Sequence, residues 1–231
     1  MRELYGRPAT VPRGWYLLPV IAFVWNQTVY NCSNLLAGNA PHYDCTTALD
    51  RITPFLPCSV LVYYFSFLYF AIVFLWIARR NRALAYRFFA ADLLAKTICL
   101  PFFLLLPTTN VRPVVAGGSL WLDMVRLLYR MDAPTNLFPS IHCLLSWLCW
   151  LGVRDAPEST TGMKRAALLT AIAICASTLM TKQHVIIDVF GGIAAAELSY
   201  RLAESPRILR AYAGMADRIT GFRRAQHCTR G

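Results

Sequence analysis

The chain has 231 residues, which is enough for one domain. Hydrophobic residues make up 57% of it and charged residues only 15%, whereas a typical soluble domain carries about 25% charged residues. This composition excludes an ordinary soluble protein and predicts an integral membrane protein. The formal net charge of +11 fits either an acidic partner such as nucleic acid or arginines that face the cytoplasm.

The apolar segments predict six transmembrane helices, each near the length of about 20 residues that a bilayer requires. In chain order they are Trp15–Leu36, Pro54–Ile77, Leu84–Leu106, Phe138–Val153, Ala166–Met180 and Val185–Ala203. The first contains several polar residues, so a signal-peptide core is its alternative interpretation. It lacks a clean cleavage site between small residues, which favours a retained span.

A seventh segment, Gly118–Met131, has helical periodicity with one polar face, and it is too short and too charged to span. It predicts an amphipathic helix in the membrane interface. The predicted fold is therefore all-α, a polytopic membrane helix bundle of about six transmembrane helices plus this short interfacial helix. Its parts are an N-terminus at residues 1–14, the membrane domain at 15–203 and a basic tail at 204–231.

Arginine and lysine residues are distributed unequally between the two sides of this topology. One side carries Arg2, Arg7, Arg13, Arg79, Arg80, Arg82, Arg87, Arg154, Lys164, Arg165 and the tail arginines from Arg201 to Arg230. The other side carries only Arg51, Arg112, Arg126, Arg130 and Lys182. The first side is predicted to be cytoplasmic, with both termini inside, in a plasma or inner membrane. This asymmetry explains the net charge without a nucleic-acid partner.

The eight cysteines form no CxxC pair and no zinc-finger spacing. Cys32, Cys45 and Cys58 surround one loop on the predicted outer side, where a disulfide is permitted. Nearness in sequence does not establish disulfide geometry, so both a disulfide and free thiols remain open.

Polar residues at the ends of spans are functional candidates, because they are costly in a membrane. His142 lies near the start of the fourth predicted span and His184 at the start of the sixth. The chain crosses the membrane twice between them, so both are predicted at the same outer face. Arg112 follows the third span and reaches that face too.

The spacing around these histidines suits nucleophilic chemistry on a phosphate ester. His184 and Asp188 are four residues apart, on one face of a helix. A carboxylate there can take the proton of one ring nitrogen and leave the other nitrogen free to attack.

Three further residues are predicted to bind phosphate. Pro139 suits a first helical turn, so the amides near Ser140 would be unpaired donors at a helix N-terminus. Arg112 offers a planar fork of donors and Lys182 a point charge. Their alternative roles are helix capping for Ser140 and anchoring at lipid headgroups for Arg112 and Lys182.

These residues resemble the type-2 phosphatidic acid phosphatase superfamily, in particular the branch that includes inositol phosphorylceramide synthases. The family motifs are K-x6-R-P, P-S-G-H and S-R-x5-H-x3-D. In this chain they read Leu105-x6-Arg112-Pro113, Pro139-Ser140-Ile141-His142 and Ser177-Thr178-x5-His184-x3-Asp188. The motif lysine is thus replaced by Leu105 and the motif arginine by Thr178, which leaves the phosphate-binding details in doubt.

The resemblance implies a role for each matched residue. His184 would form a phosphohistidine, Asp188 would orient it, and His142 would protonate the leaving alkoxide. Arg112, Ser140 and Lys182 would hold the phosphate. Family members need no metal or other cofactor, and a lipid phosphate or phospholipid in the bilayer would be the substrate.

Alternatives remain open. The acceptor of the phosphoryl group is either water, as in a phosphatase, or an alcohol, as in a headgroup transferase of the inositol phosphorylceramide synthase type. Zinc bound by His142, His184 and Asp188 is a second chemistry, and a non-catalytic transporter or scaffold is a third class. The oligomeric state is not readable from the sequence.

Two structural features are predicted within the spans. Asp92 and Lys96 lie four residues apart and should form an internal ion pair. Gly191, Gly192 and their neighbours Ala195 and Ala196 have the small-xxx-small spacing that favours close helix packing.

Overall fold

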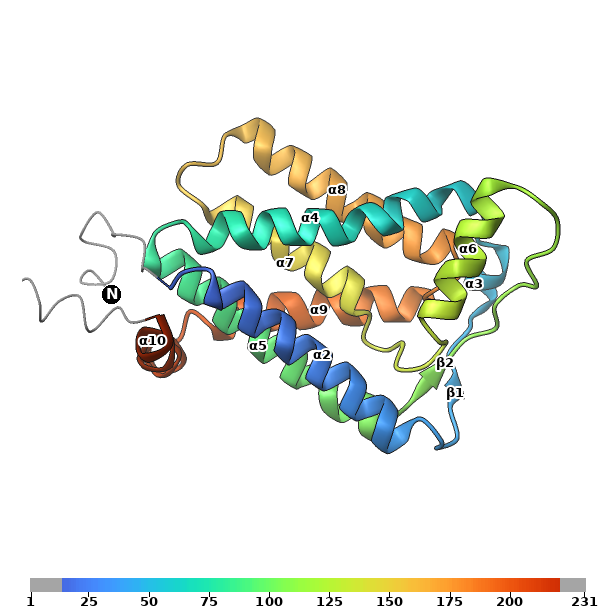
Figure 1. Cartoon of the computed structure of the whole chain (residues 1–231), viewed down its shortest axis with the longest axis horizontal. Helices are drawn as coiled ribbons and strands as arrows, with labels where there is room; N and C mark the ends of the chain where they lie inside the picture. Colours follow the sequence, from blue (N-terminus) through green and yellow to red (C-terminus); the bar gives the residue numbers. More distant parts are fainter. Residues whose placement is uncertain (1–13, 221–231) are drawn as a thin grey trace, which may run out of the picture.

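The computed structural model describes residues 14–220, and almost every element in that range is a helix. The helices are α2 (Leu17–Ala37), α3 (Ala48–Ile52), α4 (Val60–Ala78), α5 (Arg82–Leu105), α6 (Leu120–Met131), α7 (Ile141–Asp155), α8 (Thr161–Met180), α9 (Ile186–Leu202) and α10 (Pro206–Thr220). A 3-10 turn at Pro57–Ser59 leads into α4. The prediction of an all-α helix bundle is confirmed (Figure 1).

Three helices in the described range are long and apolar enough to cross a membrane: Pro57–Ala78, Arg82–Leu105 and Thr161–Met180. The other predicted spans form α2, α7 and α9, of 21, 15 and 17 residues. The protein is therefore a membrane protein, and the count of six spans stays a prediction.

Helix α7 packs against α8, α9, α4 and α5, and α2 packs against α5. Side-chain caps begin several of these helices: Asn81 Oδ1 accepts from Leu84 N at 2.8 Å ahead of α5, and Ser140 caps α7. Where α7 crosses α9, a Cβ added at Gly192 would lie 2.4 Å from the carbonyl oxygen of Ser140. The predicted close packing at Gly192 is thus confirmed.

The predicted ion pair of α5 is also confirmed. Lys96 Nζ donates to Asp92 Oδ2 at 2.8 Å, and both side chains are buried. The same ammonium donates to the carbonyl oxygen of Ala22 in α2 at 3.0 Å. A buried charge is tolerated when a partner and further hydrogen bonds satisfy it, so this pair also joins α5 to α2.

The connections at one end of the bundle contain two short elements that were not predicted. Residues Tyr43–Asp44 (β1) and Thr108–Thr109 (β2) form a parallel pair, which joins the segment after α2 to the segment after α5. The predicted amphipathic helix is confirmed as α6, which lies at this same end with Val125 and Leu128 buried against the start of α4. Figure 1 shows β1, β2, α3 and α6 together at the right-hand end.

The opposite end carries the basic residues and α10. Arg87 Nη1 bonds Asp155 Oδ2 at 2.9 Å, and Arg82 pairs with Asp217 of α10. Helix α10 lies within the predicted tail 204–231 and packs against α5 and α2. Most of the predicted N-terminal segment 1–14 and the tail beyond residue 220 lie outside the described residues.

One sequence-based expectation changes, and one question that the sequence left open is answered. Pro139 was predicted in the first turn of a helix, but α7 begins only at Ile141, because Ser140 has an extended backbone and acts as the N-cap. Cys32, Cys45 and Cys58 are free thiols, so the disulfide left open by the sequence is not formed.

Candidate active site

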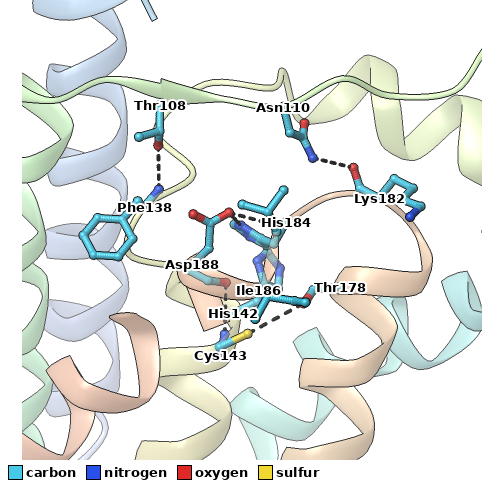
Figure 2. Close-up of polar contacts among 12 residues, drawn as sticks. Thr108, Asn110, Phe138, His142, Cys143, Thr178, Lys182, His184, Ile186 and Asp188 are labelled. Atoms are coloured by element: carbon cyan, nitrogen blue, oxygen red, sulfur yellow. Dashed lines mark hydrogen bonds and ion pairs between the residues drawn. The ribbon is translucent and has the colours of Figure 1, made fainter. Parts of the chain in front are cut away.

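The two histidines singled out from the sequence lie side by side at the end of the bundle that carries β1, β2, α3 and α6. His142 is the second residue of α7, and His184 lies in the turn between α8 and α9. Their ring centroids are 6.2 Å apart, and Figure 2 shows Asp188 beside them. The convergence predicted from topology therefore holds in the structure.

His184 is paired with the carboxylate predicted for it. Its Nδ1 is 3.3 Å from Asp188 Oδ2, one helical turn further along the chain. That oxygen also accepts from Val185 N at 3.0 Å, which fixes the carboxylate at the N-terminus of α9. Burial alone would lower the pKa of His184, but the hydrogen bond and charge of Asp188 outweigh it and raise the pKa above 6.5.

Asp50, in α3, holds the turn that carries His184. Its Oδ1 accepts from Ile186 N at 2.7 Å, and its backbone carbonyl accepts from Lys182 Nζ at 2.7 Å. From the other side, Asn110 Nδ2 donates to the carbonyl oxygen of Lys182 at 3.0 Å (Figure 2). Lys182 has a positive φ of 55°, a strained backbone that these contacts hold in place.

Lys182 is therefore a structural anchor as well as a candidate phosphate ligand. Its ammonium also donates to the carbonyl oxygen of Thr53 at 2.5 Å. Partial burial lowers the pKa of this side chain from its ordinary value.

Ser140 uses its polar atoms to join α7 to α9. Its backbone N–H donates to the carbonyl oxygen of Asp188 at 3.0 Å, and its Oγ accepts from Cys143 N at 3.3 Å. The expectation that amides near Ser140 are unpaired is corrected at these two positions, because both donors are occupied. The cap role is present, and a direct contact of Ser140 with phosphate stays a prediction.

His142 has polar partners that sequence reasoning missed. Its Nδ1 lies 3.2 Å from the hydroxyl of Tyr63, in α4. The same hydroxyl lies 3.3 Å from Oδ2 of Asp132, which follows α6. The second carboxylate oxygen of Asp132 accepts from Tyr30, in α2, at 2.7 Å. Each histidine of the pair thus has its own carboxylate, reached directly by His184 and through a phenol by His142.

Arg112 lies on the Asp132 side of the site. Its Nη1 donates to the carbonyl oxygen of Asp132 at 2.6 Å, and its guanidinium lies 4.7 Å from the ring centroid of Tyr129. Its Nε and Nη2 are buried and have no hydrogen-bond partner within residues 14–220. Burial lowers the pKa of Arg112, and the negative charge of Asp132 opposes this shift.

Leu105 and Thr178 stand where the family motifs have a lysine and an arginine. Leu105 is 81% exposed at the end of α5. Thr178 is buried, and its hydroxyl donates to Cys175 O at 2.7 Å within α8. Its carbonyl oxygen accepts from the amides of Gln183 and His184 at 3.0 and 3.1 Å. Thr178 therefore helps to fix the turn that carries His184.

Asn34, one of the polar residues that interrupt the first predicted span, contacts the loop before His142. Asn34 Oδ1 accepts from Asn136 Nδ2 at 2.7 Å and from Thr135 Oγ1 at 3.0 Å. This contact holds the loop that leads into His142. Asn34 and Tyr30, both in α2, are thus part of the support of the site.

Two cavities reach the histidines. One, of about 370 Å³, is lined by His184, Lys182, Asp50, Arg51 and Asn110 among others. The other, of about 590 Å³, is an apolar groove between α2, α4 and α7 that includes Phe67, Phe70 and His142. Each histidine therefore borders a different cavity. In the described part of the chain, no three His, Cys, Asp or Glu side chains are grouped as a metal site.

Helices able to span a membrane, together with a paired-histidine site at one end of the bundle, define a class of membrane protein with an enzyme-like centre. The model of the PAP2 superfamily matches residues 49–202, more than half of the chain. The chain belongs to the PAP2 superfamily, which confirms the resemblance at that level and supports a phosphatase-type function. No curated protein and no solved structure gives a significant match.

Proposed function

We propose that this protein is a membrane-embedded, metal-independent lipid phosphatase or phosphotransferase that acts through a phosphohistidine at His184. The observation that carries the proposal is the His184–Asp188 pair, at 3.3 Å, facing His142 across 6.2 Å between ring centroids. A nucleophile with an orienting carboxylate and a separate acid on the other side is the arrangement that substitution at phosphorus requires.

In the first step, Nε2 of His184 attacks phosphorus while its Nδ1–H donates to Asp188. The bond between phosphorus and the leaving oxygen breaks, and His142 gives its proton to that oxygen. Asp188 stabilises the positive charge that the imidazole of His184 acquires.

In the second step, an acceptor attacks the phosphohistidine, and neutral His142 takes the acceptor's proton. The phosphorus–nitrogen bond breaks and His184 returns to its starting form. Water as acceptor gives a phosphatase, and an alcohol gives a transferase.

Arg112 is the best candidate for holding the phosphate. Its Nε and Nη2 form one edge of the guanidinium, and both lack a partner in the described chain. Two parallel donors on one edge match two oxygens of a phosphate, and buried donors of this kind are costly unless an anion binds them. Lys182 and Ser140 are proposed as additional phosphate ligands near His184.

The apolar groove supports a lipid as substrate. It is lined by side chains such as Phe23, Phe67, Phe70 and Leu145, and His142 lies in its wall. A leaving group protonated by His142 would therefore depart into apolar surroundings. A lipid alkoxide fits this environment better than a soluble sugar or nucleotide does.

The charge distribution supports a site that faces the extracytoplasmic side. The basic residues Arg82 and Arg87 and helix α10 lie at the end of the bundle opposite the histidines. By the positive-inside rule, that end and both termini would be cytoplasmic.

Transfer to an alcohol, as in the inositol phosphorylceramide synthase branch, is a second candidate. The lining of the cavity beside His184 includes the polar side chains of Asp50, Asn110 and Lys182, and its volume of about 370 Å³ exceeds what a single attacking water needs. A polar alcohol fits this cavity, which is distinct from the apolar groove that His142 borders.

The test is phosphate release from a panel of lipid phosphates by purified protein in detergent, with chelator present. Wild type should release phosphate and His184→Ala should not, whereas His42→Ala, a matched histidine control outside the pair, should behave as wild type. Labelled enzyme quenched during turnover should contain an acid-labile phosphoryl group only when His184 is present. Turnover by His184→Ala would refute the nucleophile, and loss of activity in chelator would instead favour the zinc alternative.

If no lipid phosphate is hydrolysed, the same variants are assayed with labelled phospholipid donors and candidate alcohols. Transfer that depends on His184 would assign the protein to the transferase class. The absence of both activities would reject the proposed enzyme and favour a non-catalytic membrane protein.

A further inference from the structure

Tyr63 lies between the acid of the proposed reaction and a second carboxylate. Its hydroxyl is 3.2 Å from His142 Nδ1 and 3.3 Å from Asp132 Oδ2, and its side chain is fully buried in α4. Its ring also packs on the imidazole of His142, with centroids 4.4 Å apart. A buried hydroxyl with two polar neighbours fixes the hydrogen-bonding pattern of both.

The hydroxyl has only one proton, which decides the direction of the hydrogen bonds. A carboxylate accepts and does not donate, so Tyr63 donates to Asp132. The oxygen of Tyr63 then accepts from His142, and the proton of a neutral His142 resides on Nδ1. The remaining ring nitrogen, Nε2, is left for the leaving group and the acceptor.

We propose that Tyr63 and Asp132 are positioning residues that hold His142 in the Nδ1–H form needed for both steps of the reaction. This inference rests on the proposed function. Protonated His142 gives its Nε2 proton to the departing oxygen and becomes the neutral Nδ1–H tautomer. In the second step, the lone pair on Nε2 takes the proton of water or an alcohol, and Nδ1–H stays bonded to Tyr63 throughout.

The surroundings of Asp132 show that its carboxylate is held in place. Tyr30 donates to its other oxygen at 2.7 Å, and Arg112 donates to its carbonyl oxygen at 2.6 Å. Asp132 is thus tied to α2, to α4 and to the segment after α5. The contact with Arg112 also couples the position of the proposed phosphate ligand to the alignment of the acid.

The hydroxyl of Tyr63 stands between the carboxylate of Asp132 and the imidazole of His142. A direct ion pair such as His184–Asp188 retains a proton on the imidazole, which suits a nucleophile that becomes positively charged. An acid must release its proton in the transition state, so a carboxylate that acts through a neutral hydroxyl aligns the ring without an ion pair. The two histidines are thereby given different chemical roles by different contacts.

The first test separates assistance to the leaving group from a structural effect. Turnover is compared for dodecyl phosphate, which leaves as an alkoxide, and for 4-dodecyl-2-nitrophenyl phosphate, whose leaving group needs no proton. Tyr63→Phe and Asp132→Asn should lower kcat on the alkyl ester by about 10²-fold and on the nitrophenyl ester by only about threefold or less. The neighbouring variant Tyr64→Phe removes a hydroxyl that donates to the backbone carbonyl of Met124 in α6, and it should match wild type on both.

An equal loss on both esters in Tyr63→Phe would overturn the positioning role and leave a structural one. Turnover of both esters by His184→Ala would instead refute the proposed function, so the two failures are distinguishable.

The second test does not depend on turnover. In protein with ¹⁵N-labelled imidazoles, the neutral signal of His142, assigned through its loss in His142→Gln, reports which nitrogen carries the proton. Wild type should show the Nδ1–H tautomer, and Tyr63→Phe should shift toward the Nε2–H tautomer that free histidine favours. The same tautomer in both proteins would refute the inference. This test remains decisive even if neither ester is turned over.

Discussion

Asp50 Oδ1 accepts a hydrogen bond of 2.7 Å from the backbone N–H of Ile186, two residues after His184. The other carboxylate oxygen of Asp50 accepts from Thr47 N at 2.8 Å, which closes the cap of α3. A single buried carboxylate therefore connects the loop before α4 to the turn that carries the proposed nucleophile. The position of His184 depends on a residue distant from it in sequence.

Replacing Asp50 should consequently impair both stability and turnover. In Asp50→Ala, the amides of Ile186 and Thr47 lose their acceptor, which costs about 1–3 kcal/mol for each buried group left unpaired. Displacement of the His184 turn should lower kcat by about 10- to 100-fold. Thermal unfolding in detergent and initial rates measure the two effects. The control Asp123→Ala removes an exposed carboxylate of α6, and equal behaviour of the two variants would contradict the prediction.

The pH dependence of turnover should report the pairing of His184 with Asp188. The neutral imidazole attacks, so with the nitrophenyl ester, whose leaving group needs no proton from His142, kcat/KM should rise as pH increases through the pKa of His184, which Asp188 raises above 6.5 against the effect of burial. In Asp188→Asn the charge is lost while burial remains, so the acidic limb of the kcat/KM profile should move to lower pH. The maximal rate should fall on the order of 10²–10⁴-fold, because the ring is no longer oriented.

Asp123→Asn makes the same change in charge at an exposed position and should leave the acidic limb in place. An unchanged limb in Asp188→Asn would mean that another group controls the profile. A limb that moved to higher pH would contradict the assigned direction of the pKa shift.

The sequence predicted the part of the site that depends on residue spacing and on the order of the spans, namely His142, His184 and Asp188. The separation of His184 and Asp188 places both on one face of a helix, and counting spans brings His142 to the same end. Both inferences use only periodicity and topology, and the structure brings the three residues together. The resemblance to a known superfamily rested on these same motifs.

The supporting residues carried no comparable signal. Tyr63 lies in an aromatic-rich span, where a tyrosine is expected to be an ordinary packing residue. Asp132 follows an amphipathic helix, where an aspartate is expected as a polar residue at the helix end. Their roles depend on contacts across 69 residues of sequence between Tyr63 and Asp132. Asn34 was likewise interpreted as an interruption of a span, whereas it binds the loop before His142.

The position of Pro139 shows the limit of a local rule. Proline is common in the first helical turn, but the bond from Ser140 N to Asp188 O holds Ser140 in an extended conformation ahead of α7. The helix therefore begins at Ile141, and of the two roles that the sequence offered for Ser140 the capping role is the one that agrees with this start.

Gly192 should be intolerant of even one added methyl group. The new Cβ of Gly192→Ala would lie 2.4 Å from Ser140 O and 3.0 Å from Leu144 N, and backbone atoms cannot rotate away. Separation of α7 from α9 should cost about 1–3 kcal/mol and should lower turnover, because these helices carry His142 and Asp188. Thermal unfolding and initial rates measure both effects.

The matched control is Gly214→Ala in α10, where an added Cβ meets nothing within 4 Å. This change should stabilise the protein by up to about 1 kcal/mol, since alanine favours a helix over glycine. If both glycine variants were equally stable and active, the close crossing of α7 and α9 would not constrain the site.

Filling the apolar groove should change the preference for substrate chain length. Ala71 lines the groove on α4 beside Phe70 and Phe74, so Ala71→Phe places a ring where the proposed lipid chain lies. Each methylene that no longer fits loses about 0.8 kcal/mol of burial, so kcat/KM should fall for alkyl phosphates of sixteen carbons more than for those of eight. Ala173→Phe, on the exposed face of α8, adds the same ring outside the groove and should preserve the wild-type ratio. A ratio unchanged in both variants would mean that the substrate's apolar part binds elsewhere, whereas a uniform loss over all chain lengths in Ala71→Phe alone would show that the ring disturbs His142 and not the chain.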